Sequence, residues 1–343
     1  MAHMTARDLA KRAFLEANGW GNAQICFLAG DASGRSYDRA RLPDGHVAVI
    51  MDAPPEKGED VTPFVVLSDF LTSIGLSAPQ ILAAAPDSGF LLIEDLGNAL
   101  FARLVKQQPD LEEKLYTGAV DLLANLQCAT PPPLATYSAP IMSDLAALAA
   151  DWYLTGATGN ADNAFRAHLS AAMNRVIRPL EPDFSIVVLR DYHAENLLWL
   201  PDRIGVARVG LLDFQDAMIG HPAYDVVSVL QDARRDVDPD VEARMQSYFI
   251  DRTRAYPDNF RAAYAVMGAQ RNLRILGVFA RLCLRDGKPR YVDLIPRVWG
   301  LVQRNLEHPA LTEVAKLVTE NLPPPDQLLL ETLRSKCANP LAP

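Results

Sequence analysis

The sequence predicts an α+β protein of two lobes, with a β-rich amino-terminal lobe at residues 5–97 and a mainly helical carboxyl-terminal lobe at residues 98–338. Up to about residue 97, short apolar segments alternate with polar turn sequences, which is typical of antiparallel strands. Beyond that point, apolar residues recur mostly at helical spacing. The length of 343 residues is sufficient for two domains or for one domain of two lobes.

The first lobe is expected to contain a small antiparallel sheet with one inserted helix. The helix is predicted from Thr62 to Ile74, where apolar residues have helical spacing, and Gly75 ends it. Turn sequences rich in Gly, Pro, Asp and Ser separate most of the apolar runs. The predicted strands are residues 24–30, 37–42, 46–53, 78–85 and 89–96.

The second lobe is expected to be helical apart from one β insert at residues 185–214. In this insert a run of ionisable residues separates two apolar strands. Polar residues there are expected to face the cleft between the lobes, which is a common place for ligand sites. Helical spacing marks residues 111–127, 143–154 and 163–180, and nearly everything after residue 222.

Composition narrows the classes of function. A net charge of -9 and a pI of about 5.2 argue against a nucleic-acid-binding surface, which would need clustered Lys and Arg. No run of 18 apolar residues is present, so no membrane-spanning helix is expected. The first residues have the spacing of an amphipathic helix rather than of a signal peptide. We therefore expect a cytoplasmic monomer without nucleic-acid or membrane partners.

The β insert brings together residue types that suit a metal ion. Asp191 and Asn196 are separated by four residues, and Asp213 follows the next strand of the insert. Two hairpin-related strands should place these three side chains toward one end of the insert. A carboxylate and an amide oxygen held side by side are ligands suited to Mg²⁺, which completes its shell with water and phosphate. The remaining carboxylate can accept a hydroxyl proton.

This pattern resembles a known superfamily. An Asp and an Asn at this spacing, followed by an Asp-Phe pair, are similar to the catalytic and metal-binding segments of the kinase-like phosphotransferases. Within them, LRDYHAEN resembles the aminoglycoside and choline kinase group, with Leu189 in place of the usual first His. The resemblance implies a bilobal protein-kinase-like fold with ATP and Mg²⁺ as cofactors. It also implies that Asp191 is the catalytic base and that Asn196 and Asp213 are metal ligands.

A downstream segment, GHPAYDVVSVLQD, resembles the G-x-P-x-x-D segment of the same group. The resemblance implies that Asp225 supports the catalytic loop without reacting. Its position also has a simpler explanation, because Pro222 suits the first position of a helix and a carboxylate is favourable in the first turns.

Two further segments of the first lobe match the nucleotide site of such kinases. Residues 30–36 lie between the first two strands, where a flexible loop would cover the triphosphate, although a Gly/Ser turn alone is usually only a hairpin. LLIEDLG resembles the hinge whose backbone would bind adenine. The nucleotide-binding residues that follow are Gly30, Ser33, Gly34, Arg35, Ser36, Glu94 and Leu96.

The sequence departs from the superfamily at the phosphate-binding Lys of the third strand. Met51 stands near that position, and the following helix offers no obvious Glu partner. Two interpretations remain: other cations bind the nucleotide, with Arg35 and Arg39 as candidates, or the protein binds nucleotide without turnover.

Four longer segments resemble a narrower group, the bacterial cell-wall-recycling sugar kinases that phosphorylate the anomeric hydroxyl of N-acetylmuramate and N-acetylglucosamine. The similarity runs from about residue 8 to residue 335, and in this group Met-Asp-Ala-Pro replaces the usual Lys. The resemblance implies phosphorylation of these amino sugars at C1. A kinase for another hydroxyl, of an aminoglycoside or a choline-like alcohol, and a catalytically silent nucleotide-binding protein are the alternatives. The segments are residues 51–60, 189–201, 211–237 and 270–282.

The sugar pocket has weaker signals. Trp152 could stack on a sugar face, although an aromatic residue on an apolar helix more often belongs to the core. Arg271 lies in an apolar helix and needs a partner, which could be the lactyl carboxylate of N-acetylmuramate or, more commonly, a structural Asp or Glu. His193 and Glu195 could orient the substrate or only hydrogen-bond the loop backbone.

Overall fold

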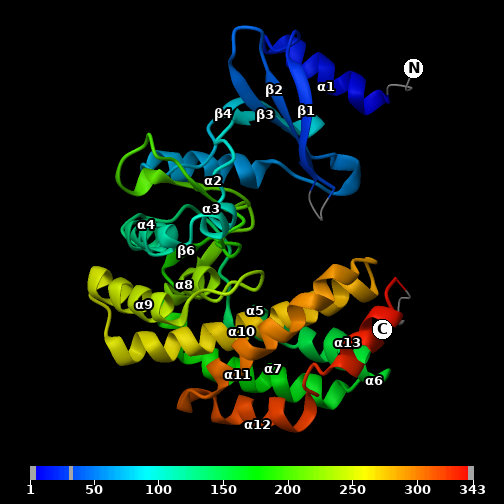
Figure 1. Ribbon diagram of the computed structural model, residues 1–343, viewed down its shortest axis with the longest axis vertical. Helices are drawn as coiled ribbons and strands as arrows, with labels where there is room; N and C mark the ends of the chain where they lie inside the picture. The colour runs from blue at the N-terminus through cyan, green and yellow to red at the C-terminus, as the bar shows by residue number, and fades with distance from the viewer. Residues whose placement is uncertain (1–4, 31–33, 339–343) are drawn as a thin grey trace. The chain divides into compact units, whose positions relative to one another are not determined.

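The computed structural model describes residues 5–30 and 34–338, and Figure 1 labels its helices and strands where there is room. The chain forms two compact units. The first comprises the residues up to Gln107 together with Glu195–Asp216, and the second comprises Gln108–Ala194 together with the residues from Ala217 on. These units differ from the predicted boundary at residue 97. They also place residues 195–216 with the first unit, whereas the sequence analysis placed them with the helical lobe.

The first unit contains a five-stranded antiparallel sheet in the order β1-β2-β3-β5-β4. All five strands were predicted within a few residues of their observed bounds, because each is a short apolar or alternating run between turn sequences. In the register of the central strands, Tyr37 lies opposite Met51 and Arg39 lies opposite Val49. The strands are β1 (Gln24–Gly30), β2 (Ser36–Arg41), β3 (Val47–Asp52), β4 (Ile81–Ala85) and β5 (Phe90–Glu94).

Helix α1 (Ala6–Ala17) packs on one face of this sheet. Its Leu15 contacts a buried cluster of Ala48, Ile50, Phe90 and Leu92. Because side chains alternate along a strand, the neighbours of Ala48 and Ile50 on β3 face the other side. The predicted helix at residues 62–74 is confirmed as α2 (Thr62–Ser73).

The β7–β8 hairpin belongs to the first unit through backbone contacts. Leu198 bridges Leu100, and Gly210 bridges Ser77. The two strands are β7 (Leu197–Trp199) and β8 (Val209–Leu211). The helix α3 (Phe101–Gln107), which comes much earlier in the chain, contacts β7.

The second unit is mainly helical, as the sequence predicts. Its longest helix, α10, packs against α5, α8 and α11 (Figure 1). The predicted helix at residues 143–154 is divided between the end of α5 and a π-helical segment at Ala149–Leu154. The helices are α4 (Glu112–Leu126), α5 (Ala139–Ala146), α6 (Thr155–Thr158), α7 (Asn163–Ile177), α8 (Ala223–Leu230), α9 (Pro239–Thr253), α10 (Pro257–Leu284), α11 (Ile295–Leu306), α12 (Thr312–Asn321) and α13 (Gln327–Ser335).

The only regular β structure described in the second unit is one antiparallel pair, β6 (Ile186–Val188) with β9 (Met218–Gly220). This pair holds the start of the predicted catalytic loop, which leaves β6 at Leu189. Within residues 5–30 and 34–338, no helix combines the length and the apolar character needed to cross a membrane.

Candidate active site

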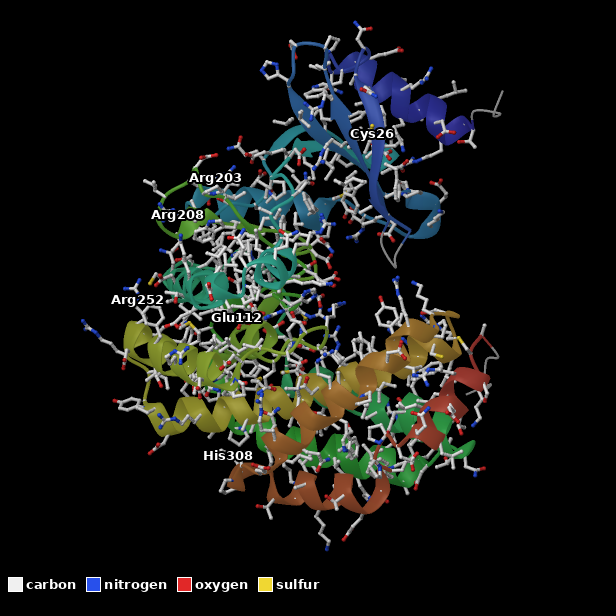
Figure 2. The ribbon with its side chains drawn as sticks, in the orientation of Figure 1. Cys26, Glu112, Arg203, Arg208, Arg252 and His308 are labelled. Atoms are coloured by element: carbon white, nitrogen blue, oxygen red, sulfur yellow. The ribbon has the colours of Figure 1, made fainter. Side chains whose placement is uncertain are left out.

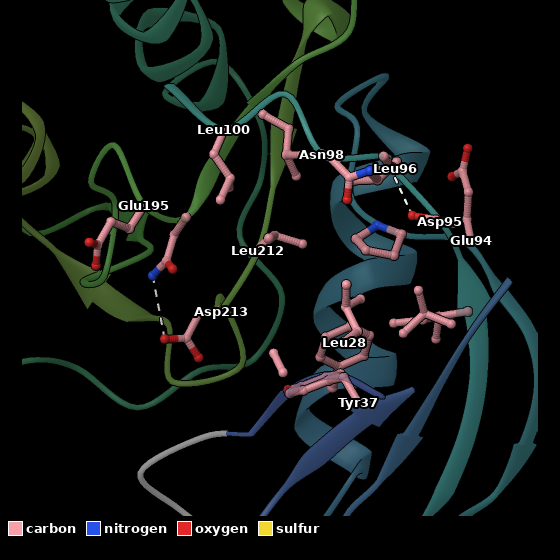
Figure 3. A pocket seen from close by; sticks show the side chains of 18 of the residues that line it. Leu28, Tyr37, Glu94, Asp95, Leu96, Asn98, Leu100, Glu195, Leu212 and Asp213 are labelled. Atoms are coloured by element: carbon pink, nitrogen blue, oxygen red, sulfur yellow. Dashed lines mark hydrogen bonds between the residues drawn. The ribbon is translucent and has the colours of Figure 1, made fainter. Parts of the chain in front are cut away.

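The first unit contains a cavity of about 370 Å³ beside the sheet (Figure 3). Apolar side chains of the strands form much of its wall, including Val49, Ile93, Leu198 and Leu212. Polar groups gather in two places, at the segment after β5 and at the end of the β7–β8 hairpin. An apolar slot between polar ends suits a flat heteroaromatic ring with a charged tail.

The segment after β5 is the predicted hinge. Glu94 and Leu96 both line the cavity, as predicted for nucleotide-binding residues. The carboxylate of Glu94 pairs with Arg203, which lies in the turn between β7 and β8 and is labelled in Figure 2. Gly97 adopts a φ of 87°, and its N–H donates to Asp95 Oδ1 at 2.9 Å. These contacts fix the backbone that lines this end of the cavity.

The end of the β7–β8 hairpin carries the two predicted metal ligands. Asn196 precedes β7 and Asp213 follows β8, and the N–H of Leu212 donates to the Asn196 carbonyl at 2.9 Å. The hairpin therefore brings the two side chains together: Asn196 Nδ2 lies 3.4 Å from Asp213 Oδ2. Figure 3 shows this contact at one side of the cavity.

The conformation of Asp213 is held from several sides. Its φ is 56°, in the left-handed region that non-glycine residues rarely adopt and that recurs at functional sites. Gln215 Nε2 donates to Asp213 Oδ1 at 2.7 Å. The next residue, Phe214, stacks on Phe64 of α2 with ring centroids 4.8 Å apart. A carboxylate oriented in this way is suited to bind a cation.

The donor set fits a hard divalent cation that keeps most of its shell for other oxygens. One carboxylate and one side-chain amide converge here, and among the residues that the structure describes no group of three or more His, Cys, Asp or Glu side chains could hold a metal. Mg²⁺ commonly binds through one or two protein oxygens together with water and phosphate. Zinc and other metals that prefer nitrogen or sulfur ligands would find a poorer site.

The loop after β1 is described only in part, since Ser33 lies outside the described residues. Gly30 lines the cavity. Ser36 begins β2 and pairs with Gly30 and Asp52. The N–H of Gly34 donates to Glu59 Oε1 at 2.8 Å.

Arg35 is bound to the same carboxylate, with Nε 2.6 Å from Glu59 Oε2. Burial acts to lower the pKa of Arg35, but the hydrogen bond to Glu59 and the charges of Tyr37, Glu59 and Asp216 raise it overall. Arg35 therefore remains a cation near Asp216, which lies three residues after the predicted metal ligand Asp213.

The position on β3 where the superfamily carries its phosphate-binding Lys is apolar and buried in this protein. Met51 is 1% exposed and lies opposite Tyr37 in the sheet. The other candidate cation, Arg39, forms an ion pair of 2.6 Å with Asp95 and donates to Asn98 Oδ1 at 2.9 Å. Arg39 thus contacts the predicted hinge segment, and Arg35 is the candidate that lies near the segment of the predicted metal ligands.

The predicted base, Asp191, lies in the second unit, in a loop that is tied down at its start. Both oxygens of Asp225 accept backbone N–H groups of this loop, from Leu189 at 2.5 Å and from Arg190 at 2.9 Å. Burial raises the pKa of Asp225 to about 7, against the effect of these two hydrogen bonds and of Arg271. Asp225 thus binds two backbone N–H groups of the loop, and its supporting role stays a prediction.

The end of the same loop is held by a second set of contacts. His193 is 4% exposed, and its Nε2 lies 3.0 Å from Arg234 Nη1. Burial, and then the charges of Arg234 and Arg271, hold the pKa of His193 well below its usual value, so its ring is neutral. The N–H of Ala194 donates to Asp232 Oδ2 at 3.3 Å.

The predicted sugar-site residues lie in different surroundings. Trp152 is in the π-helical segment and lines a separate cavity of about 420 Å³ in the second unit. Glu195 lines the cavity of the first unit. Arg271 is 3% exposed, and its Nη2 donates to Ser228 Oγ at 2.6 Å. The interpretation of Arg271 as a substrate ligand stays a prediction, and its observed contact is with the protein.

Several residues of the site were not found by sequence reasoning. Gln215, Tyr37 and Asn98 contact or line the site, and Glu59 holds the loop after β1. Gln215 could have been found, because it lies two residues after Asp213. The pairing of Glu59 with Arg35 joins residues 24 positions apart and has no spacing signal.

The family described as "Phosphotransferase enzyme family" matches residues 24–260. An N-acetylmuramate/N-acetylglucosamine kinase of Caulobacter vibrioides is 39% identical over 351 aligned positions, which cover 92% of this chain and 96% of that protein. A protein of the same name from Pseudomonas aeruginosa is 33% identical and covers 88% of this chain and 90% of its own length. These findings confirm the resemblance stated from the motifs.

Solved structures with the same fold are more distant in sequence. Choline kinase LicA from Streptococcus pneumoniae matches with a TM-score of 0.59 at 11% identity, covering 90% of this chain and 99% of that one. An aminoglycoside-3'-phosphotransferase of type VIII matches with a TM-score of 0.55 at 16% identity, covering 76% and 98%. At such identities the likeness concerns the fold alone, and it confirms the predicted α+β, kinase-like fold class.

Proposed function

This chain belongs to the phosphotransferase enzyme family, and from this premise we propose that it is an ATP-dependent kinase that phosphorylates the anomeric hydroxyl of N-acetylmuramate and N-acetylglucosamine. The observation that carries the chemistry is the pair Asn196 and Asp213, which converges at one side of an apolar cavity. The choice of sugar is supported by the names of relatives that align over most of the chain.

ATP is assigned to the cavity of the first unit. The adenine ring would occupy the apolar slot beside Val49 and Ile93, with its edge toward the backbone between Glu94 and Leu96. Its phosphates would extend toward Asn196 and Asp213, which would hold Mg²⁺. A Mg²⁺ ion held there would neutralise part of the negative charge that develops during transfer.

Arg35 takes the place of the missing Lys in this proposal. It is the cation near Asp216, and Glu59 orients its guanidinium group. An arginine fork can donate two hydrogen bonds to a phosphate, so it can replace a lysine at such a site.

Asp191 is assigned the role of base. It accepts the proton of the C1 hydroxyl as that oxygen attacks the γ-phosphorus, the bond from the γ-phosphorus to the bridging oxygen breaks, and ADP leaves with the electron pair. An anomeric hydroxyl is more acidic than an ordinary alcohol, so Asp191 needs mainly to orient it and to accept the proton late.

The test is a set of acceptors incubated with ATP and Mg²⁺ and analysed by mass spectrometry. We expect a single phosphoryl group on N-acetylmuramate and on N-acetylglucosamine. The matched control is the methyl glycoside of N-acetylglucosamine, in which the C1 oxygen is blocked. It should not be phosphorylated, and a phosphorylated methyl glycoside would contradict the anomeric assignment.

The same panel separates the alternatives. Phosphate on kanamycin or choline, with none on the sugars, would replace the proposal by a kinase for another hydroxyl. Nucleotide binding without any product would favour a catalytically silent protein. A cytoplasmic location, a monomeric state and a place in peptidoglycan recycling stay predictions alongside this activity.

A further inference from the structure

The peptide in front of Asp191 is held in an unfavourable conformation. Arg190 has a φ of 70°, in the left-handed region, which is unfavourable for a residue with a side chain. Such a conformation persists only where surrounding groups fix it. Asp225 fixes its N–H, as described above, and a second group fixes its carbonyl: Ser228 Oγ donates to the Arg190 oxygen at 3.2 Å.

Arg271 of α10 determines the direction of the hydrogen bond that the Ser228 hydroxyl donates. Its Nη2 donates to Ser228 Oγ at 2.6 Å. Arginine has no acceptor, so in this contact the serine oxygen must accept. The single hydroxyl proton of Ser228 is then directed to the Arg190 carbonyl. Ser228 is 0% exposed, so water does not compete for either bond.

The burial of Arg271 makes a purely structural role unfavourable. Its side chain is 3% exposed, and among the described residues its Nε and Nη1 atoms have no hydrogen-bond partner. Burying a charged group whose donors are incompletely paired lowers the free energy of unfolding. An apolar residue of similar length at this position would avoid that cost, so the charge is better explained by what it does for the loop.

Resting on the proposed function, we propose that Arg271, acting through Ser228, is a positioning residue that fixes the Arg190 peptide and thereby orients Asp191 toward the acceptor hydroxyl. The chain Arg271 to Ser228 to the Arg190 carbonyl is called the Arg271–Ser228 relay. This relay joins α10 and α8 to the loop. It binds the carbonyl of Arg190, whereas Asp225 binds the N–H of the same residue.

The relay gives Arg271 a role different from that of a substrate ligand. A ligand for a sugar carboxylate would be expected to present its donors to solvent, whereas the Nε and Nη1 atoms of Arg271 are buried. The two roles also differ in kinetics. Loss of a substrate ligand raises KM for the sugar, whereas loss of a positioning residue lowers kcat.

The experiment compares Ser228→Ala and Arg271→Met with Gln270→Leu as the matched control. Gln270 is 0% exposed on the same helix turn, and its Nε2 donates to the Met142 carbonyl at 2.8 Å rather than to the loop. Ser228→Ala removes both hydrogen bonds of the relay, whereas Arg271→Met and Gln270→Leu each remove one of the buried hydrogen bonds described here. The thermal midpoint of each variant is measured first, so that kinetic values come from folded protein.

We expect kcat to fall about tenfold or more in Ser228→Ala and in Arg271→Met, with KM for sugar and for ATP within about twofold of the parent. The double variant should lose no more than Ser228→Ala alone, because Arg271 acts on the loop through Ser228. Arg271→Lys should recover part of the loss. The relay is overturned if both single variants keep kcat within twofold of Gln270→Leu, or if the change is confined to KM for the sugar.

The dependence of kcat on pH provides a second readout. Three ionisable residues interact with Asp225: Arg271 of α10, and Asp191 and Tyr192 of the loop. As a carboxylate, Asp225 also accepts the two loop N–H groups. Its pKa of about 7 is lowered by Arg271 and raised by burial and Asp191. Removing the charge in Arg271→Met should raise the pKa of Asp225. As the pH is lowered, kcat should therefore begin to fall at a higher pH in this variant than in the parent. Ser228→Ala should leave that limb in place, because it keeps the charge of Arg271.

A readout without turnover separates this inference from the proposed function. Hydrogen exchange of the backbone at residues 186–194 should be faster in Ser228→Ala and in Arg271→Met than in the parent, and unchanged in Gln270→Leu. If the parent phosphorylates no acceptor, the proposed function fails while this measurement still tests the relay. Unchanged exchange in both relay variants overturns it whatever the acceptor.

Discussion

Asp191 follows a residue in the left-handed conformation, and the loop around it is bound at both ends. Replacing it by Asn keeps the shape of the side chain and removes its ability to take a proton. Asp191→Asn should therefore lower kcat by about 10²–10⁴-fold, the usual contribution of a general base. Calorimetry should find the Kd for ATP within about twofold of the parent. Asp202→Asn, at an exposed turn, is the control, and near-full activity of Asp191→Asn would contradict the base assignment.

Arg35 is the cation assigned to the nucleotide phosphates. Arg35→Met removes a charge-assisted contact and should raise KM for ATP about tenfold, which corresponds to about 1.4 kcal/mol. Glu59→Gln should shift KM in the same direction by less, since the arginine stays but is less well oriented. Arg41→Met, at the exposed end of β2, is the control. Equal KM values in the Arg35 and Arg41 variants would remove Arg35 from the site.

The motif residues could be predicted from the sequence, but the residues that contact them could not. The motif identified Asp191, Asn196, Asp213 and Asp225 because each has a fixed spacing from the others. Ser228 and Arg271 are 43 positions apart, and only the packing of α10 on α8 brings them together. From the sequence alone, Arg271 could therefore be interpreted only as a buried cation that needs a partner, either a substrate carboxylate or a structural Asp or Glu.

Most elements follow from local sequence. The strands of the first unit are short runs between turns, and the helices of the second have apolar residues at regular spacing. The segment at Ala149–Leu154 is an exception, since it has π-helical rather than α-helical bonding. Apolar spacing does not distinguish these two helix types, so this change was not predicted.

Helix α10 packs closely against that segment at Gly277. A Cβ atom added to Gly277 would lie 2.3 Å from the Leu148 carbonyl oxygen, which is backbone and cannot turn away. Gly277→Ala should therefore lower the free energy of unfolding by about 1–3 kcal/mol, as overpacking does. Urea unfolding is the measurement.

Gly300 of α11 is the matched control for this change. Nothing lies within 4 Å of a Cβ added there, so Gly300→Ala should be neutral or should stabilise by up to about 1 kcal/mol through helix propensity. A Gly277→Ala protein as stable as Gly300→Ala would show that the two helices can separate without cost.

Ligand binding and stability are coupled in the whole molecule. A non-hydrolysable ATP analogue with Mg²⁺ at about 100 times its Kd should raise the free energy of unfolding by about 2.7 kcal/mol, if it binds only the folded protein. Chelation with EDTA should remove part of the resulting increase in Tm. Asp213→Asn should show only the part that persists in EDTA.

Asp69→Asn is the control for this experiment, because Asp69 is an exposed carboxylate on α2 of the same unit. It should respond to Mg²⁺ as the parent does. A full Mg²⁺-dependent increase in Asp213→Asn would show that Asp213 is not a metal ligand.

The α+β fold class, the order of most elements and the residues of the predicted catalytic motif could be predicted from the amino-acid sequence, because they depend on periodicity and short spacings along the chain. Only the folded structure shows that β7 and β8 belong to the first unit and which residues hold the loop around Asp191. The pairing of Arg35 with Glu59 is likewise visible only in the structure. These are contacts between segments distant in the chain, and they form only when each segment buries its apolar face against another.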